Sequence, residues 1–124
     1  MPSEWMVAKL MDKIFEQSLL YDFYGELLTE HQRQIYEAAV FEDLSLGEIA
    51  EQYSISRQGV HDLLKRCDQM LLHYEEKLQL VERFLRAKQS AGALLSWADD
   101  HADAFSASMR KEFDTHMREL MDQF

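Results

Sequence analysis

Residues 44–66 decide the fold of this chain, and they read LSLGEIAEQYSISRQGVHDLLKR. Ser45 and Glu48 have the spacing of a capping box, in which each side chain bonds the backbone N–H of the other residue at the start of a helix. The tripeptide Ser54-Ile55-Ser56 then supplies a polar turn, whose central residue enters the core and whose last residue caps a second helix. This pattern predicts a helix-turn-helix, which holds its second helix at a fixed angle suited to a nucleic-acid groove.

Further helices are expected before this unit. Apolar residues recur at helical spacing over residues 3–28, either as one long helix or as a short arm before a helix that begins near Gln17. Thr29 and Gln32 have the spacing of a second capping box, which opens a helix through Phe41. We therefore predict an all-α fold, with a core of three or four helices over residues 17–67 that ends in the helix-turn-helix.

The helix that begins at Ser56 has no obvious end before Ser90-Ala91-Gly92-Ala93, because neither glycine nor proline occurs between Gly59 and Gly92. A helix as far as Lys88 would be about 50 Å long, and its far half would need another surface to cover it. Apolar or semi-apolar residues follow along it at alternating steps of four and three, the heptad pattern of a coiled coil: Val60, Leu64, Cys67, Leu71, Tyr74, Leu78, Val81 and Leu85.

A last helix is expected from near Ser96 to the C-terminus, with Asp99, Asp100 and Asp103 in its first turns. The heptad seam can pair with this helix or with a second copy of the chain, and both can operate together. We expect a homodimer, because a two-fold pair of helix-turn-helix units spans two half-sites. The predicted organisation is thus a helix-turn-helix core over residues 1–67 and a helical dimerisation extension over 68–124, with an interface formed by Leu71, Tyr74, Leu78, Val81 and Leu85.

The charge distribution limits what the second helix can bind. The chain carries a net charge of −10, whereas a protein that contacts nucleic acid normally presents a basic surface. The only basic island lies within residues 54–67, where Arg57, Lys65 and Arg66 outnumber Asp62. We therefore expect weak, salt-sensitive binding to DNA or RNA.

Helical spacing separates the inward and outward faces of this second helix. Val60, Leu63, Leu64 and Cys67 are expected to face the core. Arg57 is suited to a phosphate or to guanine, Gln58 to adenine, and the cations further along to phosphates. The alternative is an ordinary solvated face, on a helix-turn-helix that serves as a scaffold for docking another protein. The predicted contact residues are Ser56, Arg57, Gln58, His61, Lys65 and Arg66.

Other classes of function are not indicated by the sequence. It contains no nucleophile elbow, phosphate-binding glycine loop or Cys/His nucleophile pattern, so we expect no enzyme and no cofactor. The five histidines form no ligand pair at helical spacing, so no metal site is expected. Cys67 is the single cysteine, which excludes an internal disulfide and fits the reducing cytoplasm. No apolar run is long enough for a membrane span, and no export signal precedes the helices, so we expect a cytoplasmic protein.

The stretch LLYDFYGELLTEHQRQIYEAAVFEDLSLGEIAEQYSISRQGVHDLLKR, followed by HYEEKLQL, closely resembles the YlxM family of small bacterial helix-turn-helix proteins. More distantly, LTEHQRQI and the helix-turn-helix resemble the sigma-factor region that reads the −35 element. The resemblance covers residues 19–86 and implies a sigma region 4-like core. It also implies a regulatory or accessory role in the signal recognition particle pathway, whose components are then candidate partners. Gly59 and His61 depart from the family, which more often has alanine and an aromatic residue there.

Overall fold

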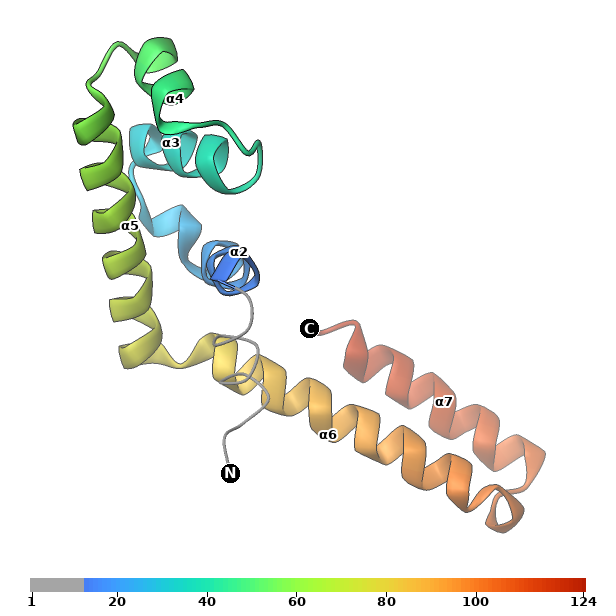
Figure 1. Ribbon diagram of the computed structural model, residues 1–124. Helices are drawn as coiled ribbons and strands as arrows, with labels where there is room; N and C mark the ends of the chain where they lie inside the picture. The colour runs from blue at the N-terminus through green and yellow to red at the C-terminus, as the bar shows by residue number, and fades with distance from the viewer. Residues whose placement is uncertain (1–12) are drawn as a thin grey trace. The chain divides into compact units, whose positions relative to one another are not determined.

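The computed structural model describes residues 13–124, and every regular element in that range is a helix (Figure 1). This confirms the predicted all-α fold; the part of the first expected helix over residues 3–12 lies outside the described residues. The chain forms two compact units, Met1–Val81 and Glu82–Phe124. The division predicted between residues 67 and 68 falls inside a helix.

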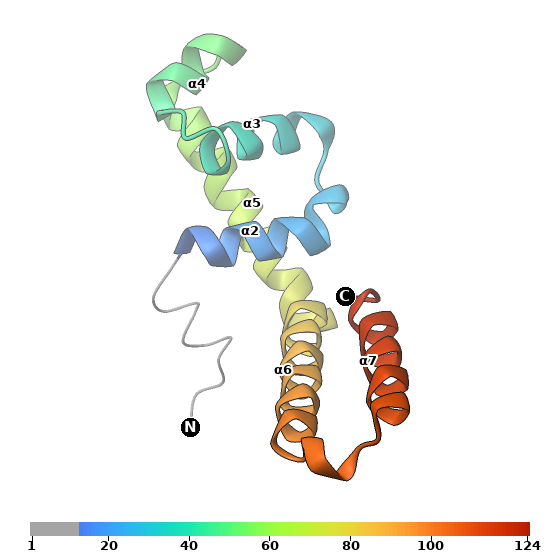
Figure 2. The same cartoon turned by 90° about the vertical axis from the view of Figure 1, so that its right-hand side faces the viewer.

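The first unit is built around one long helix. Its elements in chain order are α2 (Lys13–Tyr24), the short 3₁₀ turn η1 (Gly25–Leu27), α3 (Glu30–Val40), α4 (Leu46–Tyr53) and α5 (Arg57–Leu78). Figures 1 and 2 show α2, α3 and α4 packed along one side of α5, which leaves the opposite side of its first half open. The centre of this packing is apolar and comprises Ile35, Ala38, Ile49, Ala50 and Val60.

The predicted caps set the helix boundaries. The Thr29 hydroxyl accepts a hydrogen bond from the Gln32 N–H, and the Gln32 side chain accepts one from the Thr29 N–H. Ser45 and Glu48 make the same reciprocal pair at the start of α4. Both capping boxes are therefore confirmed, and each satisfies two N–H groups that the first turn of a helix leaves without partners.

The long helix ends earlier than predicted. α5 stops at Leu78 rather than continuing to Lys88, because Gln79 has left-handed backbone angles (φ 55°, ψ 32°). α6 (Leu80–Asp100) begins immediately afterwards. The seam is therefore not one continuous coiled-coil stripe: its members Val60, Cys67, Leu71 and Val81 are completely buried inside the first unit.

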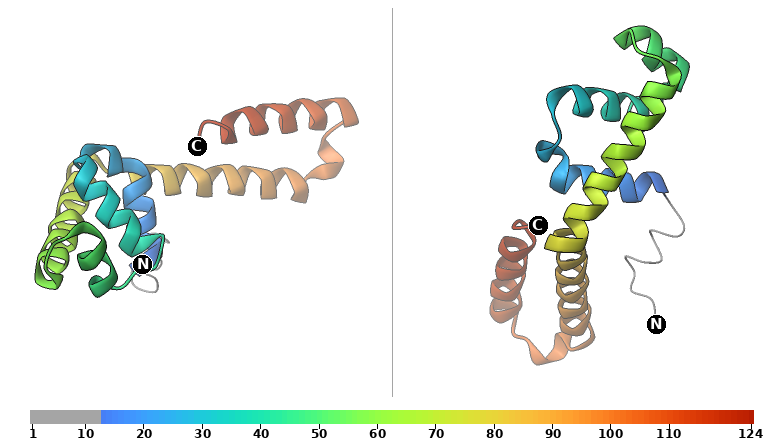
Figure 3. Two further views of the ribbon diagram at one scale, coloured as in Figure 1. Left: turned by 90° about the horizontal axis from the view of Figure 1, so that it is seen from above. Right: turned by 90° about the vertical axis from the view of Figure 1, so that its left-hand side faces the viewer.

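The second unit is an antiparallel pair of helices, with α6 connected through η2 (Ala102–Ala104) to α7 (Ala107–Met121) (Figure 3). The break predicted at residues 90–93 is wrong, because α6 runs straight through Gly92. The missing side chain of Gly92 faces open space, and one exposed glycine costs a helix only about 1 kcal/mol. The predicted helix start near Ser96 is wrong as well, since α7 begins after Ser106, whose hydroxyl accepts from the Met109 N–H.

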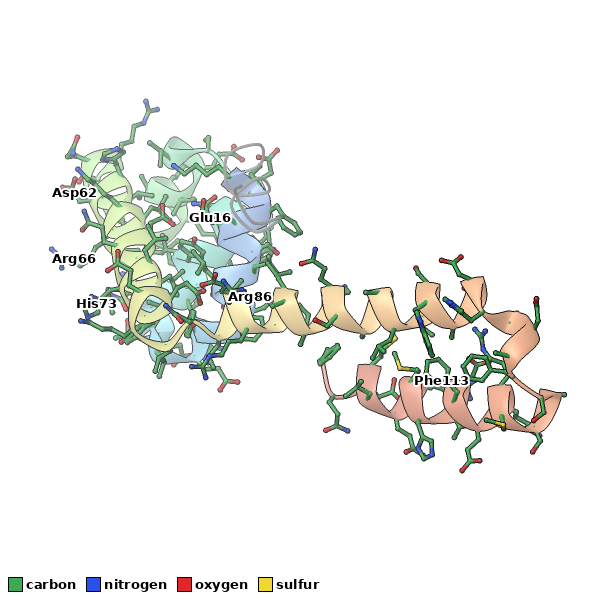
Figure 4. The ribbon with its side chains drawn as sticks, turned by 90° about the horizontal axis from the view of Figure 1, so that it is seen from below. Glu16, Asp62, Arg66, His73, Arg86 and Phe113 are labelled. Atoms are coloured by element: carbon green, nitrogen blue, oxygen red, sulfur yellow. The ribbon has the colours of Figure 1, made fainter. Side chains whose placement is uncertain are left out.

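Aromatic contacts join the two helices of this second unit. The Phe105 ring packs edge-on against Trp97 of α6, at a centroid distance of 6.0 Å, and at a tilt against Phe113 of α7, at 5.8 Å. Figure 4 shows Phe113 between the two helices. The Arg110 side chain bonds both Asp99 at the end of α6, at 2.5 Å, and Asp114 on its own helix, at 2.9 Å. Asp99 thus lies at the end of a helix and not in the first turn predicted for it.

Within residues 13–124, none of the helices combines the length and the apolar character that crossing a membrane requires.

Candidate nucleic-acid interface

The candidate interface is the open side of the first half of α5. All six predicted contact residues are exposed, whereas Val60 and Cys67 on the opposite side are completely buried. Leu63 and Leu64 are half-buried and pack against the core of the helix-turn-helix. Figure 4 shows Asp62 and Arg66 pointing away from the other helices of the unit. The predicted separation of inward and outward residues on this helix is confirmed.

The turn that precedes α5 is tightly held. Ser54 ends α4 in the left-handed region (φ 58°), a position where glycine is more usual. The Ile55 N–H then donates to the Ala50 carbonyl at 3.1 Å. The Ser56 hydroxyl accepts from the Gly59 N–H at 2.9 Å and thereby caps α5. These bonds connect α4 and α5 rigidly, so the side chains of the first turn of α5 are presented from a fixed backbone.

Arg57 lies over the start of α4. A Cβ atom at Gly47 would lie only 3.0 Å from Nη2 of Arg57 and 3.2 Å from its Cζ. The guanidinium therefore rests against the backbone of α4 at a place that is open only because residue 47 is glycine. The sequence pattern placed Arg57 at the interface but gave Gly47 no role. The contact joins two different helices, so the residue spacing within α4 or within α5 does not reveal it.

Asp62 restricts two of the predicted contact residues. The Gln58 amide donates to Oδ1 of Asp62 at 2.9 Å, and Nδ1 of His61 lies 3.5 Å from the same oxygen. Gln58 is therefore engaged within its own helix, although it was predicted to be free to pair with adenine. The spacing of four residues between Gln58 and Asp62 was the sequence signal for this bond.

The cations of this face have no such partners. Within residues 13–124, Arg57, Lys65 and Arg66 form no ion pair and no side-chain hydrogen bond. Three positive charges against the single carboxylate of Asp62 give the exposed face of α5 a local excess of positive charge, in a chain whose net charge is −10. Such a surface attracts a polyanion at short range and at low salt.

The residues predicted for dimerisation are not all accessible. Leu71 and Val81 are completely buried inside the first unit, Tyr74 and Leu85 are half-buried, and Leu78 is 46% exposed. The Tyr74 ring packs against Tyr24 at a centroid distance of 6.0 Å. Within the predicted set, Leu78 therefore offers the largest free apolar surface, and the dimer itself stays a prediction.

Cys67 is a core residue. Its side chain has no exposed surface, and burial, together with the neighbouring charge of Asp68, raises the pKa of its thiol to about 11. A thiol that is both inaccessible and protonated at neutral pH is a poor nucleophile. Cys67 contributes packing volume to the first unit.

An α4–turn–α5 unit with a capped second helix and an open outer face defines the class of the protein as helix-turn-helix. A family described as "Putative helix-turn-helix protein, YlxM / p13 like", with the family name UPF0122, matches residues 11–106. The chain belongs to the UPF0122 family, which confirms the resemblance stated above. The match continues beyond residue 86 and takes in all of α6 and the connection η2.

Proteins of several organisms are similar to this sequence, and each is called a UPF0122 protein. The relative from Desulforamulus reducens is 48% identical over 91 residues, which cover 73% of this chain and 78% of that protein. The relative from Acetivibrio thermocellus is 53% identical over 85 residues, covering 68% and 73%. The relative from Geobacillus kaustophilus is 41% identical over 107 residues, covering 85% and 97%.

Proposed function

We propose that this protein binds nucleic acid through the exposed face of α5 and acts as a regulatory or accessory factor in the cytoplasm. The observation that carries the proposal is the set of three exposed cations, Arg57, Lys65 and Arg66, on the open side of the second helix of a helix-turn-helix; none of the three is paired within residues 13–124. Arg57 starts this helix, where the residues of a recognition helix approach base edges. Lys65 and Arg66 lie further along, where a positive charge contacts the phosphate backbone.

The strength of binding follows from the charges. Neutralising three phosphates gives a salt dependence with a slope of about −3 for duplex DNA, which is shallow compared with strongly basic DNA-binding proteins. The net charge of −10 adds a long-range repulsion that salt screens. Binding is therefore measurable at low salt and weak at physiological salt, and any tighter complex requires a specific sequence or structure in the nucleic acid.

The resemblance to YlxM proteins suggests where such a target lies. Because those proteins are linked to the signal recognition particle pathway, we propose the RNA of that particle and DNA from its operon as the first specific probes. Random-sequence duplex DNA and an unrelated RNA hairpin then serve as references, since a true target exceeds them at the same salt concentration.

The test is a fluorescence titration of labelled DNA and RNA at about 50 and 200 mM salt. Arg57→Ala should weaken binding by about tenfold or more if Arg57 contacts a base edge. Arg83→Ala is the matched control, because Arg83 is an exposed arginine of α6 outside the proposed surface. Equal losses in the two variants, or no binding by the unaltered protein even at low salt, would overturn the proposal.

One observation favours a second function. Gln58 and His61 both turn toward Asp62, so two of the predicted contact residues are engaged within the helix. A protein-interaction adaptor would use the same scaffold, and its acidic surface would attract a basic partner. Binding that fails for every nucleic acid, in a protein that still captures a basic component of the signal recognition particle, would establish this alternative.

We further propose that the protein acts as a homodimer. A two-fold pair of α5 helices would contact two half-sites. Once the first contact has formed, the second is effectively intramolecular, so two weak contacts together give a higher affinity. Leu78 of the predicted seam is exposed in the first unit, and the exposed apolar residues of the second unit include Leu94, Trp97, Met109 and Leu120.

A further inference from the structure

A recess of about 440 Å³ lies between α2 and α5, beside the proposed nucleic-acid surface. α2 belongs to the part of the first unit for which sequence reasoning predicted no contact with nucleic acid. The recess shares two residues with the predicted contact set, and its lining is Lys13 and Gln17 from α2 with His61, Leu64, Lys65 and Asp68 from α5.

One side-chain contact fixes the register of the two helices. The Gln17 amide donates to both carboxylate oxygens of Asp68, at 3.0 and 3.2 Å. Lys13 precedes Gln17 by four residues, so both lie on one face of α2. His61 and Lys65 precede Asp68 by seven and three residues, so these three share one face of α5. The lining of the recess accordingly brings Lys13 of α2 together with Lys65 and His61 of α5.

The carboxylate of Asp68 in the recess already accepts hydrogen bonds from two side chains. Besides the two contacts with Gln17, Oδ1 of Asp68 accepts a hydrogen bond from the Tyr36 hydroxyl at 2.7 Å. Burial and this bond raise the pKa of Tyr36, so its hydroxyl remains a donor. Asp68 is half-buried and directed toward Gln17 and Tyr36, so its lone pairs serve to join the helices. The groups that bond Asp68 are uncharged, so the recess presents two ammonium groups against one carboxylate.

Lys13 and Lys65 lack a partner in the part of the chain that the structure describes. Neither forms an ion pair or a side-chain hydrogen bond with any residue from 13 to 124. Two ammonium groups on the walls of one recess repel each other, and the single carboxylate of Asp68 offsets only one of the two charges. Leu64 supplies an apolar portion of the lining, which suits the sugar that flanks a backbone phosphate.

We propose that this recess binds a backbone phosphate of the nucleic acid, with Lys13 as a contact residue contributed by α2. The inference rests on the proposed function and deepens it, because Lys65 belongs to both surfaces and makes the recess continuous with the exposed face of α5. The contact surface then spans two helices, and a phosphate held between Lys13 and Lys65 orients the strand relative to Arg57. Gln17 acts as a positioning residue that holds Lys13 in register through Asp68.

The experiment measures the salt dependence of binding to labelled random-sequence duplex DNA for three variants. Lys13→Gln should weaken binding several-fold and make the slope of the salt dependence shallower by about 0.9, the change expected for one lost phosphate contact. Lys13→Arg should restore both quantities, because it keeps the charge. Lys77→Gln is the matched control, since Lys77 is an exposed lysine near the far end of α5.

A double-mutant cycle tests the positioning role of Gln17. Gln17→Ala should weaken binding when Lys13 is present and have little further effect in the Lys13→Gln background. Losses from the two substitutions that simply add would show that Gln17 does not act through Lys13. Thermal unfolding of each variant, followed by circular dichroism, identifies any loss that comes from damaged folding.

The outcomes separate this inference from the proposed function. If Arg57→Ala weakens binding while Lys13→Gln leaves both affinity and slope unchanged, the recess is not a phosphate site although the face of α5 still binds nucleic acid. If Lys13→Gln and Lys77→Gln lower the slope equally, the effect is one of general charge, and the recess is again excluded. If the unaltered protein binds no nucleic acid at low salt, the proposed function fails and the inference fails with it.

Discussion

The hydroxyl of Tyr24 donates a hydrogen bond to Oε1 of Glu75 at 2.6 Å, and the two residues are only 1% and 8% exposed. The same pair holds the start of α6. The Tyr24 hydroxyl accepts from the Leu80 N–H at 3.1 Å, and the Glu75 carboxylate accepts from the Val81 N–H at 3.0 Å. Two N–H groups that the first turn of α6 leaves without helical partners are thus satisfied by side chains from α2 and α5.

Removing the hydroxyl should therefore be costly. In Tyr24→Phe, the buried Glu75 loses a donor and the Leu80 N–H loses its acceptor, so we expect the free energy of unfolding to fall by about 1–3 kcal/mol. Urea denaturation followed by circular dichroism measures this change. Tyr53→Phe is the control, because the Tyr53 hydroxyl forms no hydrogen bond within residues 13–124 and the ring packing is kept, so the expected change is below about 0.5 kcal/mol. Equal effects in the two variants would contradict the role given to Tyr24.

Stability should fall at alkaline pH. Burial, with the bond to Glu75, raises the pKa of Tyr24 to about 12, and burial raises that of Cys67 to about 11. In the unfolded chain these groups ionise near pH 10 and 9, so above pH 9 the unfolded state loses protons that the folded state keeps. Their contribution is complete below pH 9 and is lost as the pH rises toward 12.

Denaturant unfolding at successive pH values between 8 and 11 measures this dependence. The Tyr24→Phe variant should show a shallower decline above pH 10, and Cys67→Ala a shallower decline between pH 9 and 10, because each variant lacks one of the two ionisations. A free energy of unfolding that stays constant from pH 8 to 11 in the unaltered protein would rule out this linkage.

The left-handed backbone at Gln79 predicts whether a glycine there stabilises or destabilises the protein. A residue other than glycine in left-handed geometry costs about 1 kcal/mol, so Gln79→Gly should stabilise the protein by up to that amount. If α5 and α6 were instead one continuous helix, the same substitution would destabilise it by about 0.5–1 kcal/mol. Gln69→Gly is the matched control, because Gln69 is an exposed residue in the middle of α5 and its replacement should destabilise. Chemical denaturation measures whether the free energy of unfolding rises or falls in each of the two variants.

Gln79 marks a feature of the fold that the sequence pattern did not predict. The helix-turn-helix, its caps and the inward and outward faces of α5 were predictable, because each depends on residues only a few positions apart. The break at Gln79 depends on Tyr24, more than fifty positions away, and the local heptad pattern continues through it without interruption. The same holds for the recess, since the contact between Gln17 and Asp68 that forms it joins residues equally far apart.

The second unit was mispredicted for a different reason. Gly92 was taken as a helix break although a single exposed glycine is tolerated, and the alanines beside it favour a helix. The sequence did contain a signal for the true start of α7: Ser106, followed three residues later by Met109, at the spacing of a capped first turn. Ala91 and Ala98 of α6 are buried, but which segment would cover them could not be deduced from α6 alone.

The proposed homodimer is tested by light scattering on the purified protein. Leu78 is 46% exposed, so Leu78→Glu should leave the fold intact and shift a dimer that uses the predicted seam toward the monomer. Leu71→Glu is unsuitable for this purpose, because it would place a charge in the core. Leu94→Glu probes the second unit, where Leu94 is 45% exposed. A monomer mass for the unaltered protein at tens of micromolar would refute the dimer, and dissociation by only one of the two variants would locate its interface.

The substitution Gly47→Ala should displace the Arg57 side chain without lowering the stability of the fold. The added methyl group would approach Nη2 of Arg57 to 3.0 Å, and since this is the end of a flexible side chain, the guanidinium can move away. Alanine also favours a helix over glycine by up to about 1 kcal/mol, so the variant should fold at least as stably as the unaltered protein. Binding to nucleic acid should nevertheless weaken, because Arg57 loses the place on α4 that holds it at the surface.

Thermal unfolding and a binding titration on the same preparation measure the two effects. Gly92→Ala is the control, since its methyl group meets open space in the second unit. Unchanged affinity in Gly47→Ala would show that the contact between Arg57 and α4 does not position this side chain for its partner.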